Sequence, residues 1–389
     1  MLILGVTFNL CLLGYYKYAD FLIDNVAAIG LIDKATLNIV LPLAISFFTF
    51  QQIAFLVDSY KSITHEYSFT KYVLFVCFFP QLIAGPIVHH AQLIPQFSYQ
   101  NIKKNLSTKV AKGLSIFTIG LSKKVLIADS LAPIANAVFD NPEQLTLGSV
   151  DAWVGAAAYT LQIYFDFSGY SDMAIGLALM FGLYLPINFN SPYKAISIID
   201  FWRRWHMTLS AFLRDYLYIA LGGNRKGGLR RYSNLLITML LGGLWHGANW
   251  TFVMWGAMHG VYLVINHSWR YLLNSLGRSS LADSGIYKLL ALLLTFFCVL
   301  NSWVVFRAAS IDDAMALYQS MYSLVPGQLY IADKLSSALG MIAAALAVAF
   351  VMPNSLQIIQ YPKTTLQSMM GRFFQWRGNA LWGATQRCF

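Results

Sequence analysis

The chain has 389 residues, of which 57% are hydrophobic and 11% are charged, and its mean hydropathy is +0.55. Soluble domains carry about 25% charged residues, so the composition excludes a soluble enzyme and predicts an all-α, polytopic integral membrane protein. The net charge of +10 does not indicate a nucleic-acid partner, because no soluble stretch interleaves basic and aromatic residues; we place these charges in cytoplasmic loops.

Uncharged or nearly uncharged stretches recur along the whole chain. A helix needs about 20 apolar residues to cross a bilayer, so these stretches, with shorter pieces between them, predict about 8–11 membrane helices. Several contain proline or glycine, and broken or re-entrant helices are expected where protein or water covers them. No linker interrupts the series, so we expect one domain, residues 1–389. The stretches are 35–57, 72–88, 149–165, 167–189, 232–269, 289–306 and 335–353.

A basic connection precedes the longest of these stretches. Arg225, Lys226, Arg230 and Arg231 lie within a short segment. Lysine and arginine gather in cytoplasmic loops, so we expect this segment to face the cytoplasm.

The longest stretch, 232–269, contains His246 between Trp245 and Gly247. An ionisable group at membrane depth is costly, which makes His246 a functional-site candidate. Burial keeps an imidazole neutral, as a general base requires, and glycine allows a ligand to approach closely. Asn249 would share its helix face, so Asn249 and Trp245 are candidate substrate-binding residues. The alternative is a core histidine hydrogen-bonded to a neighbouring helix.

His206 is the second candidate catalytic residue. It follows Arg203 and Arg204, whose guanidinium groups could hold a phosphate or carboxylate of the substrate. The alternative is that Asp200 and Asp215 pair with these arginines.

Other ionisable residues are assigned differently. If 245–260 is one helix, His259 lies about 20 Å from His246 on nearly the opposite face, which makes it structural or part of a separate vestibule. Asp166 and Asp172 could line a polar cavity or a proton path, although pairing with an arginine of the 203–214 segment is favoured. Seven scattered histidines, His89 and His90 among them, lack His-x-x-x-His spacing, and we expect no metal site.

Several long motifs together resemble the membrane-bound O-acyltransferase family, and within it the bacterial alginate O-acetyltransferase branch. The resemblance covers nearly the whole chain, although the N-terminus is expected to be shortened relative to the family. The motifs begin at Gln162-Ile-Tyr-Phe-Asp-Phe-Ser-Gly, Asn188-Phe-Asn-Ser-Pro, Asp200-Phe-Trp-Arg-Arg-Trp-His, Arg214-Asp-Tyr-Leu-Tyr, Leu221-Gly-Gly-Asn-Arg, Leu244-Trp-His-Gly-Ala-Asn-Trp and Phe78-Phe-Pro-Gln-Leu.

This resemblance implies a fold, an activity and partners. The fold would be a ring of transmembrane and re-entrant helices around a central funnel in the cell inner membrane, in contact with lipid. His246 would be the catalytic base and His206 its polar partner. Acetyl would pass from acetyl-CoA, a donor substrate, to an exopolysaccharide hydroxyl, with an extracytoplasmic acetyltransferase as relay and no bound cofactor.

Two alternatives remain open from the sequence. One is a proton-coupled transporter in which Asp166, Asp172 and His246 relay protons, against which the absence of inverted repeats weighs weakly. The other keeps the fold and transfers D-alanine from a carrier protein to teichoic acid.

Overall fold

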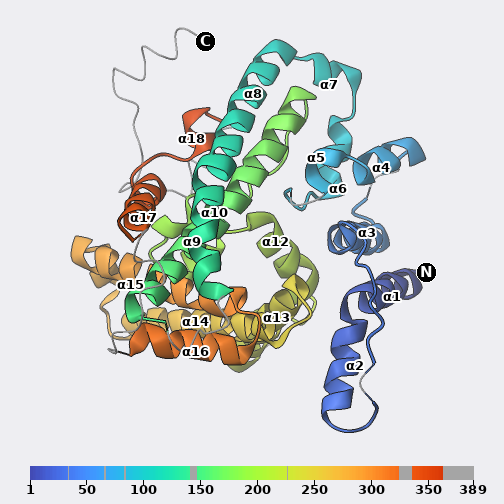
Figure 1. Cartoon of the computed structure of the whole chain (residues 1–389). Coiled ribbons are helices and arrows are strands. Elements are labelled where there is room, and N and C mark those ends of the chain that lie inside the picture. The colour runs from blue at the N-terminus through green and yellow to red at the C-terminus, as the bar shows by residue number, and fades with distance from the viewer. Residues whose placement is uncertain are drawn as a thin grey trace, which may run out of the picture.

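The computed structural model describes residues 1–33, 35–64, 67–82, 85–140, 147–225, 227–323 and 335–361, and these form helices and connecting segments without a β-strand (Figure 1). The α-helices of the first half are α1 (Leu2–Leu13), α2 (Ala19–Ala28), α3 (Ile45–Tyr60), α4 (Phe69–Val76), α5 (Phe79–Leu82), α6 (His90–Leu93), α7 (Tyr99–Lys103), α8 (Leu106–Ser122), α9 (Asp129–Phe139) and α10 (Ser149–Met180).

The second half continues with α11 (Ile198–Trp202), α12 (Met207–Phe212), α13 (Gly227–His246), α14 (Trp250–Ser275), α15 (Gly285–Arg307), α16 (Ile311–Tyr322), α17 (Leu335–Phe350) and α18 (Ser355–Ile358). Three π-helical turns directly follow α1, α8 and α12, respectively: η1 (Gly14–Tyr18), η3 (Lys123–Ala128) and η6 (Leu213–Tyr218). Three 3₁₀ turns are η2 (Ile94–Gln96), η5 (Pro192–Lys194) and η7 (Ser279–Asp283).

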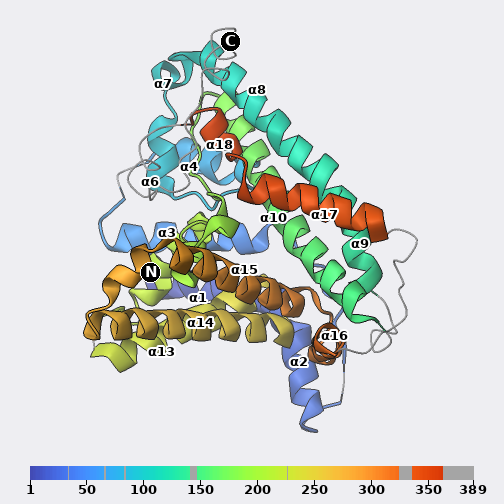
Figure 2. The same ribbon diagram turned by 90° about the vertical axis from the view of Figure 1, so that its left-hand side faces the viewer.

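The longest described helix, α10, packs along α8, and the two run side by side in both ribbon views (Figures 1 and 2). Glycines make the close approach possible. A Cβ on Gly113 would lie 2.6 Å from the carbonyl oxygen of Gly176, and one on Gly120 would lie 2.6 Å from that of Gly169. Small residues at helix crossings are typical of membrane proteins, where van der Waals packing drives helix association.

The sequence predicts two separate membrane stretches, 149–165 and 167–189, but the structure has one 32-residue helix, α10, across most of both. The helix continues through Asp166, whose carboxylate is paired with Lys124 at 2.8 Å, and ends only at Met180. The charge is therefore satisfied within the helix pair and no break is needed.

A second group of helices, α13, α14 and α15, lies roughly parallel in Figure 2, with α14 in contact with both of the others. The main buried core joins this group to α10, with Trp255 and Trp303 among its largest fully buried side chains. The core thus lies directly beside the residues that carry the two histidine motifs.

Two helical segments of the described chain are long and apolar enough to cross a membrane, Leu2–Ala28 and Gly285–Arg307, and α17 is a shorter apolar helix. Fewer segments meet these criteria than the 8–11 spans expected. The long helices α10, α13 and α14 are interrupted by polar, aromatic and small residues, which lower their hydropathy. The ring and funnel architecture, and a single domain that would include residues 362–389 outside the described chain, stay predictions.

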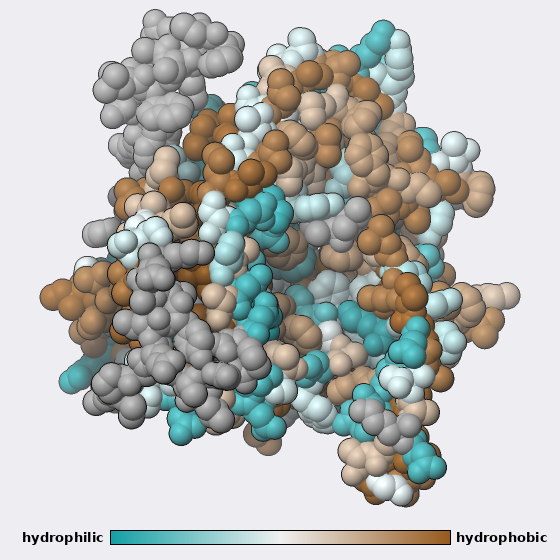
Figure 3. All heavy atoms as spheres, viewed as in Figure 1, coloured by the Kyte–Doolittle hydropathy of each residue, from teal (hydrophilic) through white to brown (hydrophobic). Residues whose placement is uncertain are grey.

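The face seen in Figure 3 is hydrophobic over much of its outer surface and hollowed near the middle, with hydrophilic side chains around the hollow. Large exposed apolar residues include Phe8, Leu22, Leu293 and Leu294. Exposed apolar patches of this kind on a chain of this composition are suited to a lipid environment.

Candidate active site

Helix α13 ends at His246, and the chain reverses direction before α14 begins at Trp250. Two glycines let α14 fold back onto α13: a Cβ on Gly243 would lie 2.2 Å from the carbonyl oxygen of Phe252, and one on Gly247 would lie 2.1 Å from the Phe252 ring. Both contacts are far below van der Waals distance. At Gly243 the neighbour is main chain, so only glycine fits there, whereas a Cβ at Gly247 would require the Phe252 ring to move. The sequence therefore places His246 at the end of a helix, beside a sharp reversal of the chain.

Asn249 caps the second helix. Its Oδ1 accepts a hydrogen bond from the Thr251 amide at 3.0 Å, and its Nδ2 donates to the Ala309 carbonyl at 2.8 Å. The expectation that Asn249 shares a helix face with His246 is wrong, because α13 ends at His246 and Asn249 has an extended backbone. A substrate-binding role for Asn249 stays a prediction, and its observed contacts are those of an N-cap.

His246 lies in an aromatic enclosure. Its imidazole is in contact with the rings of Trp245, Trp255 and Phe306, with centroid separations of 5.0, 5.2 and 5.2 Å. The residue is half-buried, and no hydrogen bond joins either ring nitrogen to another described residue. An imidazole held by aromatic rings with both nitrogens uncommitted can accept a proton from a bound substrate.

His206 is held more rigidly. It is 1% exposed, and its backbone is left-handed, with φ of 42°, at the start of α12. Its Nδ1 lies 3.1 Å from Asn188 Oδ1, which also accepts from the Thr208 hydroxyl at 2.9 Å. An amide oxygen only accepts, so Nδ1 carries the proton and Nε2 is left as an acceptor. Asn188 belongs to a motif noted in the sequence, but its role as the partner of His206 emerges only from the structure.

Trp245 joins the two histidines. Its indole contacts the His206 ring at 6.4 Å and the His246 ring at 5.0 Å between centroids, and it stacks on Phe50 at 5.1 Å. The indole N–H is buried and has no hydrogen-bond partner among the described residues. An unsatisfied buried donor between two histidines is well suited to a substrate oxygen.

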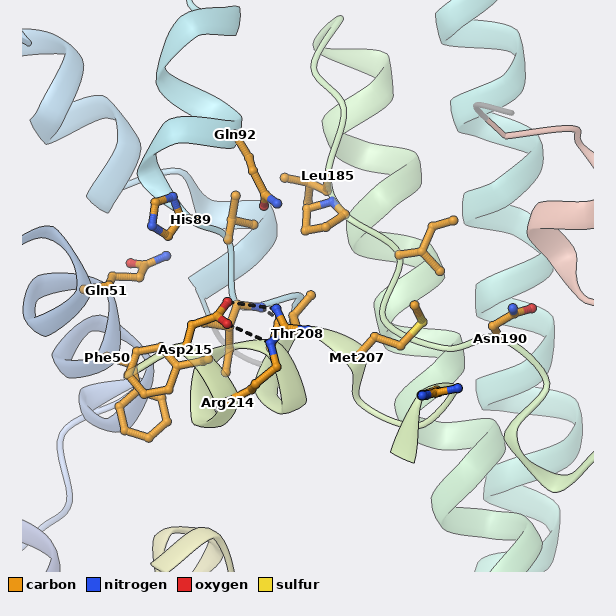
Figure 4. Close-up of a pocket in the computed structure, with 18 of the residues that line it drawn as sticks. Phe50, Gln51, His89, Gln92, Leu185, Asn190, Met207, Thr208, Arg214 and Asp215 are labelled. Atoms are coloured by element: carbon orange, nitrogen blue, oxygen red, sulfur yellow. Dashed lines mark hydrogen bonds and ion pairs between the residues drawn. The ribbon is translucent and has the colours of Figure 1, made fainter. Parts of the chain in front are cut away.

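A cavity of about 750 Å³ opens on the His206 side of this centre. Met207 and Thr208, which follow His206 in the sequence, line it together with Arg214 (Figure 4). Arg203 and Arg204 also line it, so three guanidinium groups contribute positive charge. Neither His246 nor Trp245 is among its lining residues. His206 itself is also absent from the lining, so the cavity lies beside the histidine centre, next to the Met207–Thr208 segment that follows His206.

The three arginines differ in their partners. Arg204 Nε pairs with Asp200 Oδ1 at 2.9 Å, which confirms the alternative that Asp200 pairs with one of the two arginines before His206. Asp215 instead pairs with Arg214 at 2.7 Å. Arg203 is exposed and makes no side-chain ion pair or hydrogen bond within the described chain. Arg203 thus has the guanidinium that is free to bind an anion in the cavity.

Asp166 and Asp172 pair with lysines, which corrects the expectation of arginine partners. Lys124 bridges Asp166 and Asp129, and Lys123 contacts Asp172 at 2.6 Å. These ion pairs connect η3 to α10 and lie outside the lining of the 750 Å³ cavity.

His259 has a structural role because both of its ring nitrogens are hydrogen-bonded, and not because it lies far from His246 on one helix. Its Nδ1 accepts from the Trp202 indole at 3.3 Å and its Nε2 donates to Ser302 Oγ at 2.9 Å, so both nitrogens are committed. The helix from 245 to 260 is broken, and Trp255 contacts both His246 and His259. The predicted separation of about 20 Å therefore does not apply.

A further cluster surrounds Asp58 at the cavity wall. Its Oδ2 lies 2.5 Å from His89 Nε2, 3.0 Å from His90 Nε2 and 2.6 Å from the Tyr216 hydroxyl. Three ligand atoms this close could hold a metal ion. However, His89 Nδ1 accepts from the Ala91 amide, so Nε2 carries the proton, whereas a metal-bound imidazole donates from its other nitrogen. The arrangement fits a hydrogen-bonded cluster better than a metal centre.

Residues 56–304 match the family model described as MBOAT, membrane-bound O-acyltransferase family. The chain belongs to this family. The matched region contains His206, His246 and most of the residues that line the cavity.

Curated relatives support the same membership. The chain is 46% identical to a peptidoglycan O-acetyltransferase of Helicobacter pylori over 83% of its length, and 42% identical to a probable alginate O-acetylase of Pseudomonas aeruginosa over 94%. A teichoic acid D-alanyltransferase of Streptococcus thermophilus is 26% identical over 68%. The chain spans 64%, 68% and 68% of these relatives, respectively.

Proposed function

We propose that this chain is a membrane O-acetyltransferase that carries acetyl from cytoplasmic acetyl-CoA to an exported polysaccharide, with an extracytoplasmic acetyltransferase as the relay. The observation that carries the proposal is the aromatic enclosure of His246, whose ring nitrogens have no partner within the described chain, in a member of an O-acyltransferase family. We place the protein in the cell inner membrane, where one centre can meet substrates from both sides.

In this reaction His246 removes the proton of the acceptor hydroxyl. The oxygen attacks the thioester carbonyl, the carbon–sulfur bond breaks, and the thiolate of coenzyme A takes up a proton. His206 would hold the acyl group through its Nε2 side or share the proton, since Asn188 occupies its Nδ1. The indole N–H groups of Trp245 and Trp255 have no partner among the described residues and are candidate donors to the developing oxyanion.

The cavity supports a binding site for the donor. Its volume of about 750 Å³ suits a substrate of substantial size, and the free guanidinium of Arg203 suits the phosphates of coenzyme A. Arg204, already paired with Asp200, would contribute charge and shape the wall.

The test is transfer from a labelled donor by purified protein in lipid vesicles. With acetyl-labelled coenzyme A, we expect label to move to a polysaccharide or to the relay protein, and His246→Ala to abolish the transfer. Transfer from a D-alanyl carrier protein instead, with none from acetyl-CoA, would contradict the proposed donor. Proton-coupled solute uptake without any acyl transfer would contradict the enzyme altogether.

A further inference from the structure

The N-terminal helical segment contacts both sides of the break that carries His246. Nζ of Lys17 donates a hydrogen bond to the main-chain carbonyl of Trp245, and the Tyr18 hydroxyl donates to that of Leu244 at 2.9 Å. On the other side, the Trp250 indole donates to Asn25 Oδ1 at 2.8 Å. One segment therefore contacts both the end of α13 and the start of α14.

Helix ends explain why these contacts matter. The last four carbonyls of an α-helix lack partners within the helix, and they carry partial negative charge. Lys17 and Tyr18 satisfy the carbonyls of the two residues that directly precede His246. The orientation of the His246 backbone therefore depends on donors from a segment far away in the sequence.

Lys17 is committed to this helix end. It is half-buried, and its side-chain contacts are the Trp245 carbonyl, Ser46 Oγ at 3.3 Å, and the rings of Trp245 and Tyr18. No carboxylate lies within ion-pair distance of it in the described chain. A lysine in an apolar segment is costly, so the dipole of α13 and the Trp245 ring supply its compensation.

The backbone conformation at Lys17 and Tyr18 also suggests a functional role. Lys17 and Tyr18 both lie in η1, a π-helical turn between α1 and α2. Single π-helical turns inside helices are rare and frequently found at functional sites.

We propose that Lys17 is a positioning residue for His246: by holding the last carbonyls of α13, with help from Tyr18, it sets where the imidazole lies relative to the bound substrates. This inference rests on the proposed function. Lys17 acts through the Trp245 main chain, so its loss reduces the rate of the chemical step and leaves donor binding unchanged.

The test compares single variants in the acetyl-transfer assay. Lys17→Met should lower kcat about 10- to 100-fold with KM for acetyl-CoA unchanged, because a misplaced catalytic group loses effective alignment. Lys17→Arg, which keeps a charged donor, should recover most of the activity. Tyr18→Phe removes one hydrogen bond and should cause a smaller loss of the same type. Lys71→Met, at an exposed lysine on α4, is the matched control and should behave as wild type.

Two outcomes would overturn the inference: a Lys17→Met enzyme with wild-type kcat, or a raised KM with kcat unchanged, which would make Lys17 part of the donor site. If Lys17→Met does not yield monodisperse protein on size-exclusion chromatography, Tyr18→Phe decides between the same outcomes, because it removes the hydrogen bond to the Leu244 carbonyl. Carbethoxylation of His246 by diethyl pyrocarbonate, read by peptide mass spectrometry, needs no substrate. A rate of modification that is altered in Lys17→Met supports the inference even if wild type uses another acyl donor, and an unaltered rate contradicts it.

Discussion

The indole of Trp245 contacts the imidazole of His206, with the ring centroids 6.4 Å apart, although the two residues belong to separate motifs. Because Trp245 also adjoins His246, one aromatic ring brings both histidines into a common centre. His206 is rigid and hydrogen-bonded to Asn188, whereas His246 has uncommitted nitrogens. The two histidines are therefore unequal, which fits one base and one positioning partner.

The first prediction separates His246 from His259. His246→Ala should lower acyl transfer by about 10²–10⁴-fold with little change in thermal stability, because a general base is lost and no hydrogen bond is broken. His259→Ala leaves the Trp202 and Ser302 groups unpaired, which should cost about 1–3 kcal/mol of stability. Activity per folded molecule and the melting temperature in detergent measure both effects. A His259→Ala enzyme that is stable but inactive would show that His259 takes part in the chemistry.

The second prediction concerns His206. His206→Asn should retain appreciable activity, because Asn can supply a hydrogen-bond donor and tolerates the left-handed backbone observed there. His206→Gly keeps the backbone conformation accessible and removes the side chain, so it should be inactive yet folded. Acyl transfer by equal amounts of each variant is the measurement. If Asn and Gly variants are both folded and equally inactive, His206 itself must carry a proton.

A third prediction addresses the indole of Trp245. Trp245→Phe keeps an aromatic ring beside both histidines and removes the unpartnered N–H. We expect kcat to fall about 10- to 100-fold with KM little changed, because an oxyanion donor acts mainly in the transition state. Trp269→Phe, whose indole N–H bonds to Tyr287 near the surface, is the control and should stay active. A wild-type kcat for Trp245→Phe would remove the indole from the mechanism.

The break after His246 provides the fourth prediction. Gly243→Ala should destabilise the protein and reduce activity, because its Cβ would lie 2.2 Å from the main-chain oxygen of Phe252, which no rotamer change can relieve. Gly340→Ala in α17 meets nothing within 4 Å and should be neutral or slightly stabilising. Thermal unfolding of the purified variants distinguishes them. Equal stability would show that α13 and α14 pack less closely than described.

The fifth prediction tests topology. Arg225, Arg230 and Arg231 surround the start of α13, which begins at Gly227, and Lys226 lies outside the described residues. A cysteine introduced by Gly227→Cys should resist an impermeant thiol reagent in intact cells and react after permeabilisation, since basic connections remain cytoplasmic. Exposed native cysteines must first be replaced. Labelling from outside would contradict the predicted cytoplasmic location of this basic connection.

The membrane class and the two histidine motifs are evident in the sequence, because low charge and an uncharged stretch around His246 have a direct thermodynamic meaning in a bilayer. The motifs also indicate the family. The sequence did not predict where helices end when tertiary packing determines it. A continuous helix through His246 is plausible from composition, and only the contacts of Gly243 and Gly247 with Phe252 show how the chain can reverse there.

Partnerships between distant residues required the tertiary structure. Nothing in the spacing of Lys17 connects it with Trp245, and the favoured arginine partners of Asp166 and Asp172 proved to be lysines from η3. Asn249 was expected within a helix, but it is the N-cap of α14 because α13 ends before it. The sequence by itself determined which groups are too costly to bury without a purpose; the tertiary structure decided their partners, because hydrogen bonds and ion pairs depend on distances of a few ångströms between elements that folding brings together.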